Sequence, residues 1–257
     1  MSTIRIADRE GGVRLLTLDR PPANAIERTL LTDLSAALDD ARTDGAVRAV
    51  VLTGAGEFFS GGLELAELPR DGQSMRLLLD LYRDPHLRLL TFPKPTVAMV
   101  NGHAIAAGLV LLLACDCRLG VGGDYRFGVN EVAIGAAFPR LPFEIIRLRL
   151  THTQASELLL GAALYPASHA LRLGVVDELL PPDSFEATVL SRAAHLGAYP
   201  REAYAHTKAA LMAEAVARVE AETAEEAARA AAVWVMPESL AARAAQQKKL
   251  GKETLTG

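Results

Sequence analysis

The chain has 257 residues, half of them hydrophobic and 23% charged, and its formal net charge is −4. This length allows one large domain or two small ones with a sizeable buried core, and the composition argues against disorder. Aromatic residues make up only 5% of the chain. An acidic chain with few aromatic side chains lacks the basic face and stacking platforms that nucleic-acid binding requires. We therefore expect no nucleic-acid partner.

The cysteine and histidine content argues against crosslinks and metal sites. Cys115 and Cys117 are the only cysteines, too few and too close together for a disulfide framework or a four-ligand zinc site. The six histidines show no metal-ligand spacing, and the N-terminus shows no signal-peptide pattern. The most apolar stretch, residues 96–115, is interrupted by Asn101 and Gly108 and is too short to cross roughly 30 Å of hydrocarbon. We expect a cytoplasmic protein with no metal and no membrane partner.

The first half of the chain alternates patterns typical of strands and helices. Residues 13–18 predict a strand, and residues 27–41 carry leucines at helical spacing. Residues 47–52 and 96–100 predict two buried strands, and each leads into a glycine-bearing turn. The second of these turns opens an apolar helix over residues 108–114. This order indicates an α/β fold built from stacked units, not separate domains.

The second half is predicted to be mostly helical. Thr153 is a candidate cap for a helix over residues 154–160, and Ser168 is one for a helix that ends at Gly174. Residues 175–180 are expected to be extended. The alanine-rich segment 213–232 is predicted to be one helix packed on another surface, such as a partner subunit. Two acid–base pairs at i,i+4 spacing support it, namely Glu214 with Arg218 and Glu225 with Arg229.

Two common glycine and serine motifs fail on spacing. Gly54 and Gly56 follow a strand, but the third glycine of a dinucleotide-binding loop is replaced by Phe59, and no P-loop lysine follows. Ser60 lacks the flanking glycines of a hydrolase nucleophile elbow. Nucleotide binding and serine hydrolysis are therefore not predicted.

Two strand-to-helix turns and one acid remain as candidates. Residues 60–62 and 106–108 are small, so a ligand could approach their backbone N–H groups, and two such donors on one oxygen form an oxyanion hole. Either turn taken alone is more often chain geometry than a ligand site. Glu131 lies in a largely apolar stretch. A buried carboxylate has a raised pKa and can carry a proton near neutral pH.

These residues bring the sequence close to a known family. From Ile4 to about Met212 it resembles the crotonase superfamily, the enoyl-CoA hydratases and isomerases. Several ordered motifs at family spacing are strong evidence, whereas one alone would be weak. The matching segments are Asp19-Arg-Pro-Pro-Ala-Asn-Ala25, residues 51–62, residues 94–104, Phe127-Gly-Val-Asn-Glu131 and residues 170–177.

The resemblance implies a fold, a substrate and an assembly. The fold is the α/β ClpP/crotonase spiral of ββα units, with a spiral core over residues 1–195. A helical region over residues 196–257 would form trimers and cover the active site. The substrate is an acyl-CoA thioester, with no cofactor other than the coenzyme A that the substrate carries. A homotrimer or a dimer of trimers is expected.

The resemblance also implies roles for individual residues. The oxyanion-hole donors would be the backbone N–H groups of Gly61 and Ala107. Glu131 matches one catalytic acid of the hydratases. The backbone positions that would hold coenzyme A are Ala23, Ala25, Gly61, Gly62 and Leu63.

One departure from the family pattern concerns the second acid. Hydratases carry a glutamate nine residues after the asparagine that matches Asn101, and here that position is Val110. A single carboxylate suffices to move a proton between two carbons, which shifts a double bond from the β,γ to the α,β position. Asn130 before Glu131 is also similar to the isomerase branch. The departure therefore favours isomerisation.

Alternatives remain open at this stage. Hydration could use Glu131 alone or with Glu57 or Glu64, and thioester hydrolysis or decarboxylation could use the same oxyanion hole. A non-catalytic acyl-CoA-binding scaffold is a different class of function, in which Glu131 would form a structural salt bridge with Arg126 or Arg140. The acyl-chain pocket is expected around residues 77–81, Phe138 and Phe143.

Overall fold

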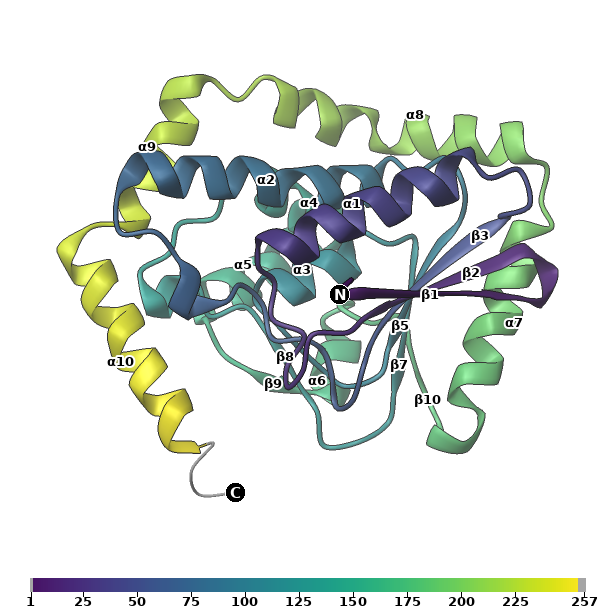
Figure 1. Cartoon of the computed structure of the whole chain (residues 1–257), viewed down its shortest axis with the longest axis horizontal. Coiled ribbons are helices and arrows are strands. Elements are labelled where there is room, and N and C mark those ends of the chain that lie inside the picture. The colour runs from purple at the N-terminus through teal and green to yellow at the C-terminus, as the bar shows by residue number, and fades with distance from the viewer. Residues whose placement is uncertain (1, 254–257) are drawn as a thin grey trace.

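The larger of two β-sheets runs through the right half of the molecule as drawn in Figure 1. The computed structural model describes residues 2–253, with side chains described through residue 250. β1 pairs with β2 antiparallel, and all other neighbouring strands of this sheet are parallel. In spatial order its strands are β1 (Ile4–Arg9), β2 (Val13–Leu18), β3 (Ala49–Gly54), β5 (Thr96–Val100), β7 (Cys117–Val121) and β10 (Glu178–Leu180).

A smaller sheet repeats the order of the larger one. Three of its strands each follow the next strand of the large sheet: β4 after β3, β6 after β5 and β8 after β7. Each pair then leads into a helix or a 3-10 turn, which is the ββα unit of the predicted spiral. The fold class predicted from the sequence is therefore confirmed. The strands are β4 (Phe58–Ser60), β6 (His103–Ile105), β8 (Arg126–Gly128) and the antiparallel β9 (Tyr165–Pro166).

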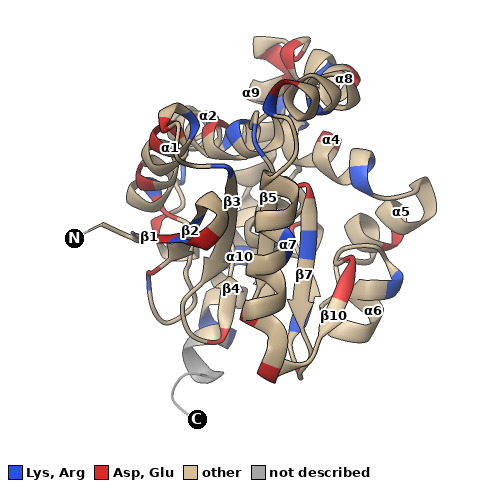
Figure 2. Ribbon diagram, turned by 90° about the vertical axis from the view of Figure 1, so that its right-hand side faces the viewer, with Lys and Arg blue, Asp and Glu red and all other residues tan. Residues whose placement is uncertain are grey.

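Helices cover both faces of the large sheet (Figures 1 and 2). The helices are α1 (Arg28–Thr43), α2 (Gly72–Leu90), α3 (Ala107–Leu113), α4 (Arg140–Arg149), α5 (His152–Gly161), α6 (Ala167–Arg172), α7 (Phe185–Gly197), α8 (Arg201–Glu220), α9 (Ala224–Trp234) and α10 (Pro237–Glu253). The 3-10 turns are η1 (Glu10–Gly12), η2 (Leu65–Glu67), η3 (Val132–Ile134) and η4 (Pro182–Ser184).

The strands of the large sheet are apolar on both faces because each face packs against helices. In β3, Val50 and Leu52 belong to the main core, whereas Ala49 and Val51 face a second core that includes residues of α7. This alternation follows from the two-residue period of side chains along a strand. Figure 2 shows α7 in front of the sheet. Burial of both faces accounts for the near-continuous apolar runs in the sequence.

Several predicted element boundaries need correction. Residues 13–18 and 96–100 are strands with the predicted bounds, and the N-cap of α1 is Glu27, which was predicted as the first helical residue. The cap of α5 is Thr151, not Thr153, because Thr151 forms a capping box with Gln154. The helix α6 begins after Pro166, so Ser168 lies inside it.

The predicted alanine-rich helix is two helices. α8 ends at Glu220, and α9 begins after Thr223, whose side chain accepts a hydrogen bond from the N–H of Glu226 in a capping box. The capping residue stops the helical pattern although alanine favours its continuation. The predicted ion pair between Glu214 and Arg218 is present on α8.

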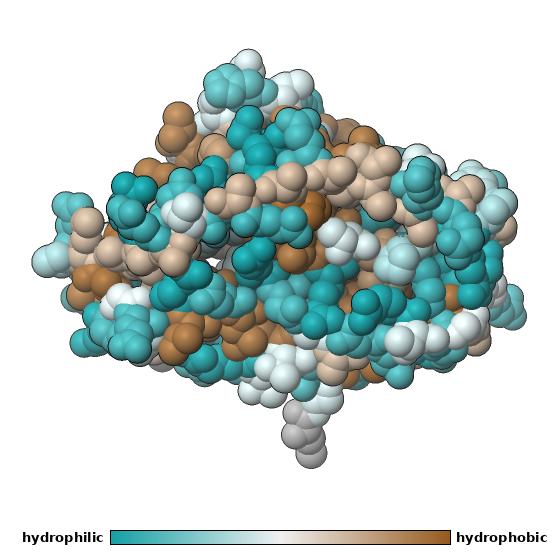
Figure 3. Space-filling model, turned by 90° about the horizontal axis from the view of Figure 1, so that it is seen from above, coloured by the Kyte–Doolittle hydropathy of each residue, from teal (hydrophilic) through white to brown (hydrophobic). Residues whose placement is uncertain are grey.

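The C-terminal helices cross the top of the molecule and descend along one side (Figure 1). Lys208 on α8 forms a buried ion pair with Asp116 at 2.8 Å, which ties α8 to the core. α10 packs on η2 and η3. Figure 3 looks down on the upper face, where hydrophilic and hydrophobic areas are interspersed. Within residues 2–253, no helix is long and apolar enough to span a membrane.

Candidate active site

The turn after β4 lies beside the loop after β2. The N–H of Gly61 donates to the carbonyl of Ala23 at 2.8 Å, and the N–H of Ile26 donates to the carbonyl of Gly62 at 2.7 Å. The structure therefore brings residues 23–26 and 61–64 together, and these segments contain all five predicted coenzyme A contacts.

One predicted oxyanion donor is wrong as stated. The N–H of Gly61 is occupied by Ala23, so it is not available to a substrate oxygen. The N–H of Leu63 makes no hydrogen bond to any residue that the structure describes. The free donor of this turn is therefore Leu63, two residues after Gly61, because the pairing with residues 23–26 uses the Gly61 amide.

The second turn, residues 106–108, packs against the first. Ala107 is the first residue of α3, and its N–H also makes no hydrogen bond to a described residue. A Cβ atom on Gly62 would lie 2.8 Å from the Ala106 Cβ and 3.3 Å from the Ala107 nitrogen. Gly62 has a φ of +87°, so only glycine fits this contact without strain. The Leu63 and Ala107 amides are thus close together.

Ala106 holds the second turn in a strained conformation. Its φ is 52° and its ψ is −126°, a combination that L side chains rarely adopt. The Ala106 N–H donates to the carbonyl of Gly128 at 2.8 Å, which fixes the turn to β8. Such strain costs about 1–3 kcal/mol and persists where the surrounding structure holds the residue in place. Here it leaves the next amide, that of Ala107, free of the β-ladder.

Glu131 is the buried acid at the end of the third unit. It follows β8 at the start of η3, and it is 7% exposed. Its Oε2 atom is buried and has no hydrogen-bond partner among the described residues. Burial raises the pKa of the Glu131 carboxyl to about 7. The group can therefore exchange a proton near neutral pH.

Among the residues that the structure describes, no cation pairs with Glu131, so the predicted structural salt bridge is absent there. Arg126 pairs with Asp124 at 2.6 Å, and Arg140 pairs with Glu226 at 3.4 Å. No ion pair between Glu131 and either arginine is present among the described residues. A carboxylate with a structural role at this depth would be paired.

Neither Glu57 nor Glu64, the two candidates for a second catalytic acid, is placed to act with Glu131. Glu57 is exposed. Glu64 pairs with Arg20 at 3.0 Å and caps η2, so its carboxylate is engaged in the turn. Val110 on α3 is 1% exposed and leaves an apolar wall at the position of the hydratase glutamate. The pKa of Glu131 is raised by burial, and no second carboxylate contributes to its shift.

The comparisons with known proteins agree with this geometry. Residues 8–239 match the family model for enoyl-CoA hydratase/isomerase. The chain belongs to the enoyl-CoA hydratase/isomerase family, within the crotonase superfamily. It is 34% identical over 206 residues to a probable enoyl-CoA hydratase of Mycobacterium avium, covering 78% of each chain. It is 39% identical over 179 residues to a putative enoyl-CoA hydratase of Thermus thermophilus, covering 67% of this chain and 70% of the relative.

Solved structures share the whole architecture. Human mitochondrial Δ3-Δ2-enoyl-CoA isomerase matches with a TM-score of 0.91 and 25% identity, over 99% of this chain and 100% of that one. A methylmalonyl-CoA decarboxylase matches with a TM-score of 0.85 at 20% identity, which shows the fold alone. The family is therefore shown, while its members differ in the reaction their names state.

Sequence reasoning missed two buried residues beside the site. Tyr82 and His86 lie one turn apart on α2, with ring centroids 4.0 Å apart. The Nδ1 atom of His86 lies 2.8 Å from the Tyr82 carbonyl, and its Nε2 lies 3.5 Å from the Ala107 carbonyl. Burial lowers the pKa of His86 to about 4, so its ring is neutral. The i,i+4 spacing on an apolar helix face was the available signal, but it equally describes core packing.

Tyr82 lies on α2 beside the second turn. It is 3% exposed, and burial, followed by the charge of Glu131, raises the pKa of its hydroxyl well above the ordinary value. Its ring lies against that of His86, whose Nε2 is 3.5 Å from the Ala107 carbonyl. Tyr82 is therefore part of the wall around the candidate site.

Proposed function

We propose that this protein converts β,γ-unsaturated acyl-CoA thioesters to their α,β isomers, with Glu131 as the single proton carrier. The observation that carries the proposal is the buried Oε2 of Glu131, which has no partner among the described residues, together with valine at position 110. Two acids orient the water that a hydratase adds. One acid in an apolar wall suits transfer of a proton between two carbons.

The free backbone amides supply the electrostatic part of the mechanism. The N–H groups of Leu63 and Ala107 would donate to the thioester oxygen, where negative charge develops when the α-carbon loses a proton. Each such donor is worth about 3 kcal/mol in stabilising the charged intermediate. Ala107 keeps its predicted role in this proposal, and Leu63 replaces Gly61.

Glu131 would perform both proton transfers. Its carboxylate removes a proton from the α-carbon. The electrons of that C–H bond form a double bond from the α-carbon to the thioester carbon, and the carbonyl π electrons move onto the oxygen that the two amides hold. When the carbonyl re-forms, those electrons shift into the α,β double bond while the electrons of the β,γ double bond take the same proton at the γ-carbon. The carboxylate is regenerated, and no water or cofactor is consumed.

Coenzyme A would lie against the paired backbone segments of residues 23–26 and 61–64. Ala23, Ala25, Gly61, Gly62 and Leu63 keep their predicted positions there, with small side chains at four of the five. We include the homotrimer or dimer of trimers in this proposal. Large exposed leucines on three helices support further association, namely Leu77, Leu160 and Leu211.

Hydration of 2-enoyl thioesters is the second candidate. The relatives with 34% and 39% identity are named as probable or putative enoyl-CoA hydratases, which favours it. It would require Glu131 to orient and deprotonate water without a second carboxylate.

An assay of both substrates separates these reactions. We expect 3-enoyl-CoA to be converted to 2-enoyl-CoA, with negligible water addition to 2-enoyl-CoA. When the reaction runs in D₂O, a buried single base should return part of the original hydrogen to the γ-carbon. Faster hydration of 2-enoyl-CoA than isomerisation of 3-enoyl-CoA would contradict the proposal. Absence of both activities would favour the scaffold.

A further inference from the structure

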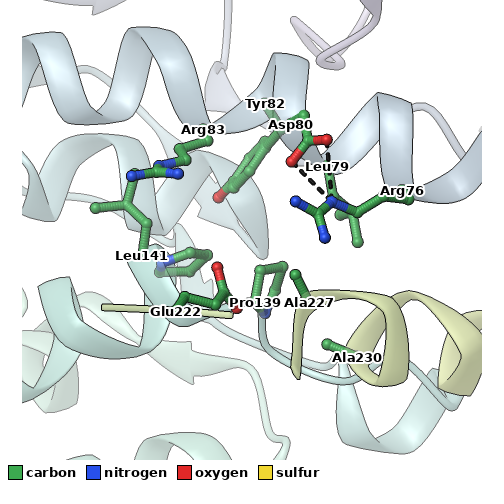
Figure 4. A pocket seen from close by; sticks show the side chains of 11 residues that line it. Arg76, Leu79, Asp80, Tyr82, Arg83, Pro139, Leu141, Glu222, Ala227 and Ala230 are labelled. Carbon is green, nitrogen blue, oxygen red and sulfur yellow. Dashed lines mark hydrogen bonds and ion pairs between the residues drawn. The ribbon is translucent and has the colours of Figure 1, made fainter. Parts of the chain in front are cut away.

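Tyr82 lines a pocket, and Figure 4 shows its hydroxyl pointing into it. Its walls come from α2, from the start of α4 and from the α8–α9 connection with α9. Leu79, Leu141 and Pro142 supply apolar surface. It lies within the region of α2 where the acyl-chain pocket was expected, but Phe138 and Phe143 do not line it.

Two donors in this pocket have no partner. The guanidinium of Arg83 forms no ion pair or hydrogen bond with another described residue, and its Nε atom is buried. The hydroxyl of Tyr82 likewise makes no hydrogen bond to a described residue, and Figure 4 shows it directed into the pocket. A half-buried cation beside an unpaired hydroxyl is unfavourable unless water or a ligand satisfies both groups.

The other charges of the pocket are placed differently. Arg76 is already neutralised by Asp80, whose carboxylate lies 2.9 Å from its Nε (Figure 4). Glu222, from the α8–α9 connection, is directed toward the pocket and forms no ion pair with another residue that the structure describes. With respect to the described residues, Arg83 is therefore the cation of the lining without an ion pair, and Glu222 is the acid without one.

Tyr82 links this pocket to the second turn of the candidate site. Its ring centroid lies 4.0 Å from that of His86, whose Nε2 is 3.5 Å from the Ala107 carbonyl, and its side chain also lines the pocket. An acyl chain held with its α- and γ-carbons at Glu131 would pass Tyr82 and end near Arg83. The hydrocarbon part would meet the leucine and proline surface on the way.

We propose that the acyl group carries a carboxylate at its distal end, which binds Arg83 and the Tyr82 hydroxyl. This inference rests on the proposed function for the location of the acyl group. The guanidinium and the hydroxyl are donors, and a carboxylate accepts from both at once. A methyl end would leave both donors unsatisfied and desolvated, so the pocket selects against it. Glu222 limits the preference, because its charge repels the bound anion.

The test compares substrates that differ only at the distal carbon. One series is 3-enoyl-CoA with a terminal methyl group, and the other has a carboxylate in place of that methyl, with chain length varied in both. At the chain length that reaches Arg83, we expect kcat/KM for the carboxylate to exceed that for the methyl compound by about 10- to 100-fold, as a charge-assisted hydrogen bond in a buried site allows.

Two variants assign the preference to the named side chains. Arg83→Met should lower the ratio of kcat/KM for the carboxylate substrate to kcat/KM for the methyl substrate to one or below. Glu222→Gln should raise this ratio several-fold. Arg42→Met, on the exposed face of α1, is the matched control and should leave the ratio as in the wild type. If Arg83→Met fails to fold, the Glu222→Gln result still decides, because it removes one negative charge beside the bound carboxylate and leaves Arg83 in place.

Binding of unreactive ligands separates this inference from the proposed reaction. Calorimetry with glutaryl-CoA against pentanoyl-CoA, and adipoyl-CoA against hexanoyl-CoA, requires no turnover. Tighter binding of the carboxylates that is lost in Arg83→Met supports the inference even if isomerisation is not the reaction. Isomerisation without any preference for the carboxylate, or a preference that Arg83→Met retains, would overturn the inference and leave the proposed function intact.

Discussion

Two buried carboxylates in this protein have opposite surroundings. Glu144 on α4 is 0% exposed, and its oxygens lie 2.7 Å from Nε of Arg218 and 3.4 Å from Nη1 of Arg147. Glu131 is 7% exposed, and its Oε2 has no partner among the described residues. Glu144 joins α4 to α8, whereas Glu131 follows β8, whose Gly128 carbonyl accepts a hydrogen bond from Ala106 in the second turn.

The difference shows how the same side chain serves structure or chemistry. Arginines around Glu144 hold its carboxylate in ion pairs that tie α4 to α8. Burial without a partner destabilises the charged form of Glu131 and brings its pKa to about 7. A group that is costly to bury in this way is a candidate for function because packing alone does not explain it.

The largest expected effect is the loss of activity when Glu131, and not Glu144, is replaced. Glu131→Gln should lower kcat for 3-enoyl-CoA by about 10²- to 10⁴-fold, the contribution of a positioned general base. Affinity for a saturated acyl-CoA should change little, because the amides and the coenzyme A contacts remain. Steady-state kinetics and calorimetry check the two values. Retained turnover in this variant would contradict the role of Glu131 as the proton carrier.

The pH dependence is the next largest effect. Glu131 accepts a proton only when ionised, and its pKa is raised to about 7. We expect kcat/KM to rise about tenfold per pH unit from about pH 5 to about pH 7, and then to level off. A profile that is already flat above about pH 5 would show an ordinary carboxyl and contradict the burial argument.

The same pKa shift predicts a sign for stability. A carboxyl whose pKa is higher in the folded state favours folding below its ordinary value of 4.5, and this contribution is lost as the pH rises to about 7. Glu131→Gln lacks this titration, so its melting temperature should equal or exceed that of the wild type at neutral pH.

The smallest effect concerns the structural carboxylate. Glu144→Gln should destabilise the fold by about 1–3 kcal/mol, because it removes the charge that the surrounding arginines hydrogen-bond. Turnover per folded molecule should be unchanged. Glu214→Gln is the matched control: it pairs with the same Arg218, but its side chain is 87% exposed, so its loss should cost no more than about 1 kcal/mol. Thermal unfolding measures both. Equal effects of the two variants would contradict the contrast between buried and exposed carboxylates.

Local patterns in the sequence were sufficient for much of the fold. The strands at residues 13–18 and 96–100 were predicted with their observed bounds because mostly apolar runs end there at turn residues. Helix ends were less certain. Thr153 was chosen as the cap of α5, although Gln154 three residues after Thr151 is the capping-box pattern that the structure shows.

The candidate site shows where sequence reasoning reaches its limit. Glu131, Ala107 and the valine at position 110 could be named from spacing and resemblance to the family. The choice between Gly61 and Leu63 could not, since it depends on which amide the carbonyl of Ala23 occupies. Tyr82 and Arg83 gave no signal, because an aromatic and a basic residue on a helix are usually core and surface.

The sequence by itself determined the family, the order of the ββα units and the presence of one acid where hydratases have two. These follow from apolar periodicity, turn residues and motif spacing, which are local along the chain. Only the tertiary structure decided which amides stay free, that Glu131 is buried without a partner, and that Arg83 shares a pocket with Tyr82 and Glu222. Hydrogen-bond occupancy and burial depend on neighbours far away in sequence, so no local pattern contains them.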